Sequence, residues 1–335
     1  MRLGIVGATG AVGQAFLEWL PRFELDVQEL RLFASPRSAG KTIPFSGQNL
    51  RVQPVGEESF RGLDLVFFSA GSSVSEQWAP IAQRKGVLVI DNSRAFRLHP
   101  SVPLVVAGVN SSDLFAHHGI IANPNCSTIQ MCVALKAVQD LFGMRRIIVS
   151  TYQAASGAGA KAMDELLNQA RSFNEGTNSS GNVFPHPLLM NLIPRIDALR
   201  DNGYTGEEMK LVEETRKIFH SPALKISATA VRVPVLRAHS ESITVEVQRS
   251  IDLEVLRKEW EKHPGIRVMD DPAKDVYPMP LYVAGEPHTF IGRLRKDLAF
   301  ENGVSFWVVA DQLLRGAAVN ALEIAKEWKE GGPQQ

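Results

Sequence analysis

A glycine-rich segment close to the N-terminus constrains the fold of this chain more than any other feature. Glycines at positions 7, 10 and 13 separate an apolar run, Leu3–Gly7, from a helical pattern, Ala11–Leu20. Glycine allows a tight turn, and the helix N-terminus that follows presents free N–H groups to an anion. The spacing differs from the usual G-x-G-x-x-G and is weak alone. Its place directly after a strand predicts a dinucleotide-binding turn rather than a turn without a ligand.

The order of the elements that follow predicts two domains. The first part of the chain alternates short β-rich runs with helical patterns, which is typical of a parallel sheet. Further strands are predicted at Glu29–Ala34, Leu63–Phe68, Val87–Ile90 and Gly119–Ala122, and helices at Val74–Lys85 and Ser127–Leu141. Longer alternating runs then predict a mixed, largely antiparallel sheet, at Arg146–Gln153, Leu224–Val233, Ser242–Arg249, Thr289–Arg295 and Gly303–Ala310.

We therefore predict an α/β chain with a Rossmann-type parallel-sheet domain and an α+β domain. The last helix, Asp311–Trp328, is long and amphipathic, and we expect it to return to the first domain. This makes the first domain discontinuous, with residues 1–126 and 311–335, and leaves residues 127–310 to the second. The Asn-, Ser- and Gly-rich segment Ser172–His186 is predicted to be a surface loop.

Composition excludes several classes of protein. Lys plus Arg and Asp plus Glu both number 36, so the formal net charge of zero argues against a nucleic-acid partner. No apolar run approaches the length of about 20 residues that a membrane span needs, and we expect no signal peptide. Cys126 and Cys132 lie too close together for a structural disulfide, which favours the cytosol. Motifs with metal-ligand spacing are absent, so no metal is predicted.

The end of the second strand indicates which dinucleotide is bound. An NAD enzyme usually has Asp or Glu about 20 residues after the glycine turn, to bind the ribose hydroxyls. Leu32–Ser38 contains no acid but has Arg37 between Ser35 and Ser38. Because a guanidinium can bind a phosphate through two hydrogen bonds, we predict NADP rather than NAD. The alternative is that Arg37 is a solvated loop cation.

Cys126 is the candidate nucleophile. It follows a predicted strand in the polar segment Asn123–Thr128 and precedes a helical run, so it is expected at a helix N-terminus. The helix dipole there favours the thiolate. A thiolate that attacks an acyl group forms a thioester, which accepts a hydride more readily than a carboxylate. The alternative is a small core residue, which is the interpretation we prefer for Cys132, among apolar neighbours in mid-helix.

Three further segments carry candidate polar groups. Arg232 and His239 would lie on opposite faces of one straight strand, but Pro234 breaks the ladder, and a turn could bring them together. On this basis His239 is as easily structural as catalytic. Thr205 and Glu208 form a predicted capping box at a helix start. Arg94 and Arg97 follow a strand at the sheet's carboxyl edge, where anions bind.

Together these motifs resemble the bacterial aspartate-β-semialdehyde dehydrogenase family, nearly from end to end. The resemblance rests on Gly7–Gly13, Ser35–Lys41, Ser69–Gly71, Asn123–Thr128, Ser150–Gly159, Glu207–Lys210, Arg232–Ser242, Gly292–Leu298 and Gly316–Asn320. It implies reversible NADP-dependent reduction of aspartyl-4-phosphate to aspartate semialdehyde with phosphate release, which supplies lysine, threonine, methionine and diaminopimelate synthesis. It further implies a cytoplasmic homodimer or tetramer, assembled through the second, catalytic domain.

The resemblance also implies a role for each site residue. The catalytic group is Cys126 as nucleophile, His239 as general acid/base and Gln153, which orients the acyl group. Arg232 binds the substrate carboxylate, Glu207 the ammonium, and Arg97, Asn125 and Lys210 the phosphate. The cofactor contacts are Gly7, Thr9, Gly10, Ala11, Val12, Gly13, Ser35, Arg37, Ser38, Ser69, Ala70, Gly71, Asn92, Ser156, Gly157 and Asn320.

Three departures from the family pattern are apparent, and alternatives to the family's function remain to be distinguished. Ala107-Gly108 stands where the family usually has Pro-Glu, Arg94 stands where it has Ser, and the loop Ser172–His186 is short. One alternative is N-acetyl-γ-glutamyl-phosphate reductase, which performs the same chemistry on a longer, acetylated substrate. A second is a catalytically silent paralogue that only binds the nucleotide. A hydrolase built on Cys126 and His239 is a more remote alternative, because it would not need the glycine turn.

Overall fold

A computed structural model describes residues 1–177, 181 and 183–331. The chain forms two compact units. Unit 1 consists of Met1–Asn125, the short segment Lys217–Phe219 and the C-terminal segment from Ala317. Unit 2 consists of Cys126–Arg216 and His220–Gly316.

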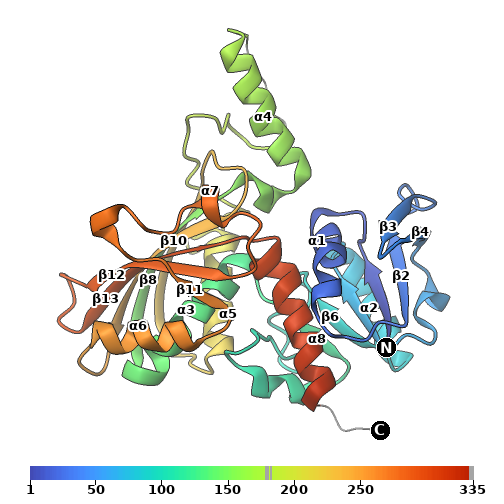
Figure 1. The fold of residues 1–335 in the computed structure, drawn as a ribbon, viewed down its shortest axis with the longest axis horizontal. Coiled ribbons are helices and arrows are strands. Elements are labelled where there is room, and N and C mark those ends of the chain that lie inside the picture. The colour runs from blue at the N-terminus through green and yellow to red at the C-terminus, as the bar shows by residue number, and fades with distance from the viewer. Residues whose placement is uncertain (178–180, 182, 332–335) are drawn as a thin grey trace. The chain divides into compact units, whose positions relative to one another are not determined.

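Unit 1 is built on a seven-stranded sheet of order β3-β4-β2-β1-β5-β6-β7 (Figure 1). Its strands are β1 Arg2–Val6, β2 Glu29–Ala34, β3 Thr42–Phe45, β4 Gln48–Pro54, β5 Leu65–Phe68, β6 Leu88–Asp91 and β7 Ile120–Ala122. All neighbouring pairs are parallel except β3 and β4. This confirms the predicted parallel sheet, whose central strands are apolar because both faces are covered.

The hairpin β3–β4 is absent from the sequence prediction. Its side chains are largely half-buried or exposed, so the apolar signal is weak, and Pro44 interrupts it. The signal that could have shown it is the Ser46–Gly47 turn, where both residues have positive φ (47° and 78°). Two consecutive positive φ values are typical of the type I′ turn that connects antiparallel strands.

The helices of unit 1 are α1 Ala11–Trp19, α2 Ser72–Arg84 and α8 Asn320–Gly331. Phe16 of α1 stacks on Phe67 of β5 with ring centroids 4.5 Å apart, within a fully buried core. The predicted last helix began at Asp311, which is wrong, because a π-helical turn at Leu314–Val319 precedes α8. Such turns are rare and often occur at functional sites.

Unit 2 contains a six-stranded mixed sheet of order β11-β12-β13-β10-β8-β9. Its strands are β8 Met144–Gln153, β9 Lys225–Arg232, β10 His239–Val247, β11 Ile266–Val268, β12 Thr289–Lys296 and β13 Gly303–Ala310. Its helices are α3 Cys126–Phe142, α4 Ala160–Asn174, α5 Gly206–Ile218, α6 Leu253–Lys262 and α7 Pro280–Val283. Helix α3 packs on β8, β10 and β13 and on α6, which buries the apolar face of the sheet. The predicted mixed sheet is confirmed.

Two predicted boundaries in unit 2 are wrong. Strand β10 begins at His239, before the predicted Ser242, because its polar first residues are paired with β8 and β13 inside the sheet. The predicted loop Ser172–His186 begins inside α4, which continues to Asn174 and stands away from the sheet of unit 2 in Figure 1. Residues 178–180 and 182 of that predicted loop lie outside the described part of the chain. Within the described part, no helix is long and apolar enough to cross a bilayer.

Candidate active site

Cys126 is the first residue of α3, where the sequence placed it. Its side chain is half-buried, so it is not enclosed in apolar packing. The positive end of the helix dipole favours a thiolate at this position. Cys132 differs in each respect: it is fully buried in mid-helix, and burial strongly raises the pKa of its thiol. Cys132 is therefore a core residue, and Cys126 is the cysteine available for chemistry.

Arg232 and His239 lie together, although seven positions separate them in the sequence. Arg232 is the last residue of β9 and His239 the first of β10, so the intervening turn reverses the chain. Both bind the backbone of Ala154: the Arg232 Nη1 donates to its carbonyl oxygen at 2.6 Å, and its N–H donates to His239 Nδ1 at 3.0 Å. The predicted turn around Pro234 thus brings both side chains to one place.

Gly157 leaves the space that these two side chains occupy. A Cβ added at Gly157 would lie 2.7 Å from Arg232 Nη1 and 3.0 Å from His239 Nε2. A residue larger than glycine at position 157 would therefore clash with the side chains of Arg232 and His239. Its neighbour Ser156 is also buried, and its hydroxyl accepts a hydrogen bond from the Gln312 amide.

The hydrogen bond from Ala154 determines the protonation of His239. Because Nδ1 accepts from a backbone N–H, the neutral ring carries its proton on Nε2. Nε2 itself has no hydrogen-bond partner among the described residues. Burial, together with the nearby Arg232 charge, holds the pKa of His239 well below its usual value. The ring is therefore a neutral group that presents an N–H beside Gly157, which suits it to donate a hydrogen bond from Nε2.

Glu207 is the centre of a polar cluster at the start of α5. One carboxylate oxygen accepts from Gln153 Nε2 at 3.1 Å, and the other accepts from Lys210 Nζ at 2.9 Å. Gln153 Nε2 also donates to the hydroxyl of Ser127, next to the candidate nucleophile, at 3.1 Å. Burial opposes ionisation of Glu207, but the Lys210 ammonium, the Gln153 amide and the Arg232 charge outweigh it and lower its pKa. Glu207 is thus a buried carboxylate that can receive a cation.

The predicted capping box at the start of α5 is confirmed. The Thr205 N–H donates to Glu208 Oε2 at 2.7 Å, and the Glu208 N–H donates to Thr205 Oγ1 at 3.3 Å. The other Glu208 oxygen accepts the Ala230 N–H of β9 at 3.0 Å. Glu208 therefore fixes the helix start to the sheet, which positions Glu207 and Lys210 in its first turns.

In unit 1, the glycine turn follows β1 and leads into α1. Gly7 has φ +95°, and a Cβ there would lie 2.4 Å from the Ser69 carbonyl oxygen, while one at Gly13 would lie 2.2 Å from the Gly7 carbonyl oxygen. These two glycines allow strand, turn and helix to pack. At Gly10, the N-cap of α1, a Cβ would meet only the Gly7 oxygen, at 3.3 Å, and no side chain caps the helix. Thr9 precedes the N-cap in the turn, and Ala11 and Val12 are the first two residues of α1.

Two neighbouring strands end beside this turn. Ser69, Ala70 and Gly71 follow β5, and Asn92 follows β6; both strands lie on the same side of β1 in the sheet. The side-chain nitrogen and oxygen of Asn92 are buried without a hydrogen-bond partner among the described residues. An unsatisfied buried amide at the carboxyl edge of a parallel sheet fits a bound dinucleotide.

The segment after β2 also fits the predicted cofactor. Ser35 and Arg37 are exposed and Ser38 is half-buried, in a turn closed by a 2.8 Å hydrogen bond from the Ser38 N–H to the Ser35 carbonyl oxygen. The turn contains no acid, so nothing in it opposes a 2′-phosphate beside Arg37.

Arg97 and Asn320 have structural partners in unit 1. Arg97 is buried and donates to the carbonyl oxygens of Asn123 at 2.9 Å and Asn92 at 2.8 Å. The fully buried Asn320 amide donates to Val105 O at 3.0 Å and Asn123 Oδ1 at 2.6 Å and accepts from the Ala107 N–H at 3.0 Å. Both side chains therefore brace the segment that ends at buried Asn125, directly before Cys126.

Sequence reasoning missed three residues near these groups. Asp91 is a buried carboxylate that accepts from the hydroxyls of Ser75 and Ser93, both at 2.7 Å, and so orders the turn containing Asn92. Lys217 donates to the carbonyl oxygens of Arg97, His99 and Val102 at 2.7–2.8 Å. Asp197 accepts from Lys210 Nζ at 3.0 Å. Only a charge in an otherwise apolar stretch could have indicated Asp91.

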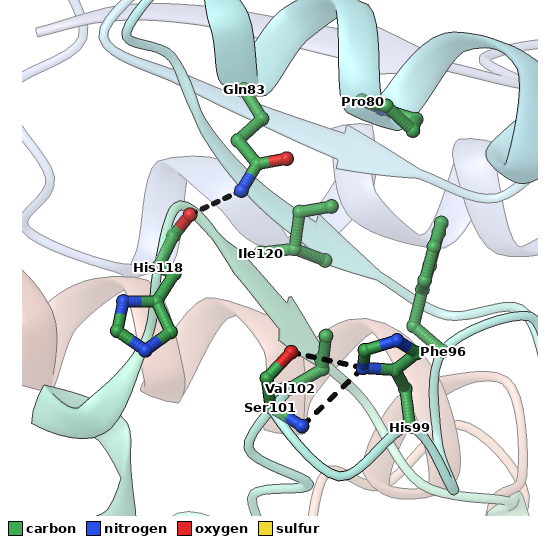
Figure 2. Close-up of a pocket in the computed structure, with 8 residues that line it drawn as sticks. All are labelled: Pro80, Gln83, Phe96, His99, Ser101, Val102, His118 and Ile120. Atoms are coloured by element: carbon green, nitrogen blue, oxygen red, sulfur yellow. Dashed lines mark hydrogen bonds between the residues drawn. The ribbon is translucent and has the colours of Figure 1, made fainter.

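Unit 1 also contains a cavity of about 170 Å³ that involves none of the predicted site residues. Figure 2 shows its lining, in which the Ser101 N–H and hydroxyl contact His99 Nδ1 and the Gln83 amide donates to the His118 carbonyl oxygen. Within the described ranges, no group of three or more His, Cys, Asp or Glu side chains is arranged to hold a metal.

Comparison with known proteins defines the class. Residues 2–117 match the family model described as semialdehyde dehydrogenase, NAD binding domain, and residues 135–315 match the semialdehyde dehydrogenase, dimerisation domain. The two matches together cover most of the chain and show that it is a semialdehyde dehydrogenase in fold and domain composition.

The relatives define the family more narrowly. Aspartate-semialdehyde dehydrogenase from Aquifex aeolicus is 50% identical over 97% of both chains, and the one from Bacillus subtilis is 45% identical over 98% of both. The crystal structure of aspartate semialdehyde dehydrogenase II from Vibrio cholerae has a TM-score of 0.96 and 44% identity, covering 99% of both chains. The chain therefore belongs to the aspartate-semialdehyde dehydrogenase family, which confirms the resemblance found in the sequence.

Proposed function

We propose that this protein catalyses the reversible NADP-dependent reduction of L-aspartyl-4-phosphate to L-aspartate 4-semialdehyde, with release of phosphate. The observation that carries the proposal is the accessible cysteine at the start of α3, in the same unit as Arg232, His239, Gln153 and Glu207. A relative from Vibrio cholerae, 44% identical, has been crystallised in complex with ASA. In this role the enzyme supplies lysine, threonine, methionine and diaminopimelate biosynthesis.

The reaction begins at sulfur. The Cys126 thiolate attacks the acyl carbon of the acyl phosphate, the carbon–oxygen bond to phosphate breaks, and a thioester forms. Gln153 orients the acyl group. NADPH, when bound, supplies the hydride that reduces the thioester carbonyl. His239 donates a hydrogen bond from Nε2–H to the oxygen on which negative charge develops. When this oxyanion collapses, the carbon–sulfur bond breaks and releases the aldehyde and the thiolate.

The substrate is held by opposite charges. We assign the α-carboxylate to the Arg232 guanidinium, the α-ammonium to the buried Glu207 carboxylate, and the phosphate to Arg97, Asn125 and Lys210. Support comes from the charge state of Glu207, whose pKa is lowered by Lys210 despite its burial. An anion at that place has no role toward an acetamide, so Glu207 favours the aspartyl substrate over N-acetyl-γ-glutamyl phosphate. Assaying both acyl phosphates side by side distinguishes the two.

For the cofactor, we propose NADP held on unit 1 by three segments. The turn Gly7–Gly13 would bind the pyrophosphate, with Ser69–Gly71 and Asn92 beside it at the sheet edge, and Ser35, Arg37 and Ser38 would bind the 2′-phosphate. Ser156, Gly157 and Asn320 complete the proposed contacts. A solved relative from Candida albicans, 25% identical with a TM-score of 0.75, contains NADP.

We further propose a cytoplasmic homodimer, with a tetramer as the larger form. The support is the match of residues 135–315 to a dimerisation domain. We also propose that residues 1–126 together with 311–335 form one domain and that residues 127–310 form the other. Sedimentation of the purified protein tests the assembly.

Mass spectrometry of the thioester tests the proposed reaction most directly. The protein is mixed with L-aspartyl-4-phosphate in the absence of reduced cofactor, so that the acyl group cannot be removed by hydride. We expect an aspartyl adduct on Cys126, located by peptide mapping after acid quenching. An unmodified Cys126, or an adduct on another residue, would rule out the covalent route.

Arg232→Lys is expected to raise the KM for aspartate semialdehyde about tenfold, because lysine keeps the charge but loses the two-pronged guanidinium. Initial rates at varied substrate and fixed NADP and phosphate measure the effect. Thermal unfolding should change little. The matched control is Arg195→Lys, the same change at an exposed position. An unchanged KM in Arg232→Lys would show that this side chain does not bind the substrate.

Arg37→Ala is expected to raise the KM for NADPH about tenfold or more while leaving the KM for NADH unchanged, because only NADPH carries the 2′-phosphate. Kinetics with both cofactors provide the measurement. Arg51→Ala, at an exposed position of β4, serves as the control. Equal effects on the two cofactors would contradict 2′-phosphate binding by Arg37.

A further inference from the structure

Lys210 lies between two carboxylates at the proposed substrate site. Its Nζ donates to Glu207 Oε2 at 2.9 Å and to Asp197 Oδ2 at 3.0 Å. Burial works against the charge on Lys210, but the two carboxylates outweigh burial and raise the pKa of the ammonium. The two carboxylates around Nζ therefore form a binding position for an ammonium group.

Asp197 is held in this position by its local backbone. Its φ of +74° is rare for a residue with a side chain, although Asp tolerates this region better than most. Its second oxygen accepts the Ala198 N–H at 2.9 Å. Gly206, the first residue of α5, leaves room for it, since a Cβ at Gly206 would lie 2.7 Å from Asp197 Oδ2. The second carboxylate, although partly exposed, is thus held beside Lys210 by its own backbone and by the space at Gly206.

The charges create a conflict for Lys210. The two carboxylates place negative charge directly against the Lys210 ammonium, which disfavours binding of phosphate by Lys210. The proposed substrate, however, brings its own α-ammonium, which can make the same two hydrogen bonds. If that ammonium takes the place of Nζ, Lys210 is released with its charge unpaired.

We propose that Lys210 occupies the carboxylate pair that receives the substrate's α-ammonium, and that Asp197, the second carboxylate of the pair, withholds Lys210 from phosphate until a free amine displaces it. This assignment rests on the proposed function, because it identifies which substrates that same site selects. Asp197 is a specificity-determining residue in this scheme. An N-acylated amino acid cannot displace Lys210, because its amide nitrogen carries no charge.

Calorimetry with inorganic phosphate tests the exchange without catalysis. Phosphate is titrated into the full-length protein alone, with saturating L-2-aminobutyrate, and with saturating N-acetyl-L-2-aminobutyrate. We expect the free amino acid to tighten phosphate binding about fivefold or more, within the usual range of coupling between two ligands, and the acetylated one to have no effect. Equal tightening by both compounds would overturn the proposal.

Asp197→Asn provides a sharper test, because the proposal predicts that this variant binds phosphate more tightly. With one carboxylate removed, phosphate alone should bind about fivefold more tightly than to the unmodified protein, and L-2-aminobutyrate should add less. Unchanged or weaker phosphate binding by Asp197→Asn would contradict this role of Asp197. If Asp197 only supported the local structure, its replacement would weaken phosphate binding. The matched control is Asp201→Asn, the same change at an exposed position nearby, which should leave phosphate binding unchanged.

Separate titrations distinguish this proposal from the proposed function. If L-2-aminobutyrate itself does not bind, the aspartyl substrate class is wrong and the exchange falls with it. If L-2-aminobutyrate binds but does not change the affinity for phosphate, the exchange alone is wrong.

Discussion

Cys126→Ala should lower the turnover of aspartate semialdehyde by about four orders of magnitude, because it removes the atom that forms the thioester. Without the thiolate no thioester can form, so hydride transfer would have to proceed without the covalent intermediate. The measurement is NADPH formation from aspartate semialdehyde, NADP and phosphate. Binding of NADP and thermal stability should stay close to those of the unmodified protein, since the side chain is only half-buried.

The control for this prediction is Cys132→Ala. Cys132 is fully buried, and its weak contact is with the hydroxyl of Thr215, at 3.8 Å. Its loss should reduce stability modestly through packing while the rate is retained. Activity of more than a few per cent in Cys126→Ala would mean that covalent thioester chemistry is wrong for this enzyme.

Gly316→Ala should lower kcat about 100-fold with a much smaller change in KM. A Cβ at Gly316 would lie 2.7 Å from Cys126 Cβ and 3.1 Å from its Cα, so the added methyl group must displace the nucleophile. Gly316 lies in the π-helical turn Leu314–Val319, whereas the proposed substrate clamps Arg232 and Glu207 lie on other elements. Misplacing the sulfur therefore impairs attack more than binding.

Two measurements separate this effect from general destabilisation. Alkylation of Cys126 by iodoacetamide should slow in Gly316→Ala, and the rates at saturating substrate should account for most of the loss. Gly56→Ala is the matched control, because a Cβ there would have its nearest neighbour, Ser59 Oγ, 4.0 Å away. A Gly316→Ala enzyme with normal kcat would show that the turn does not position the nucleophile.

The parallel strands at the centre of the first sheet were predictable because each of them has a local signature. Strand β5, Leu65–Phe68, is buried at every residue and reads as one apolar run. The half-exposed hairpin β3–β4 lacks such a run and was missed. The capping box of Thr205 and Glu208 was also predictable because it is a local pattern: its two residues lie three positions apart in the sequence.

Local sequence patterns do not show which of the site residues lie together. Gln153 lies beside Arg232 because β8 and β9 pair in parallel register, and no pattern in either strand specifies that pairing. The contact of Asp197 with Lys210 crosses the loop before α5, and that of Gly316 with Cys126 joins segments far apart in the chain. Without the resemblance to a family, His239 could not have been separated from a structural histidine.

Local interactions along the chain were therefore enough to indicate a dinucleotide turn, a cysteine at a helix start and a two-part α/β fold. They could not show which charges face one another, because this depends on strand register and on close packing at glycines. The placement of His239 illustrates the difference. Its position at the start of β10 follows from pairing with β8 and β13, and its protonation is determined by the backbone of Ala154, distant in sequence. Such contacts form only when the folded chain brings them together.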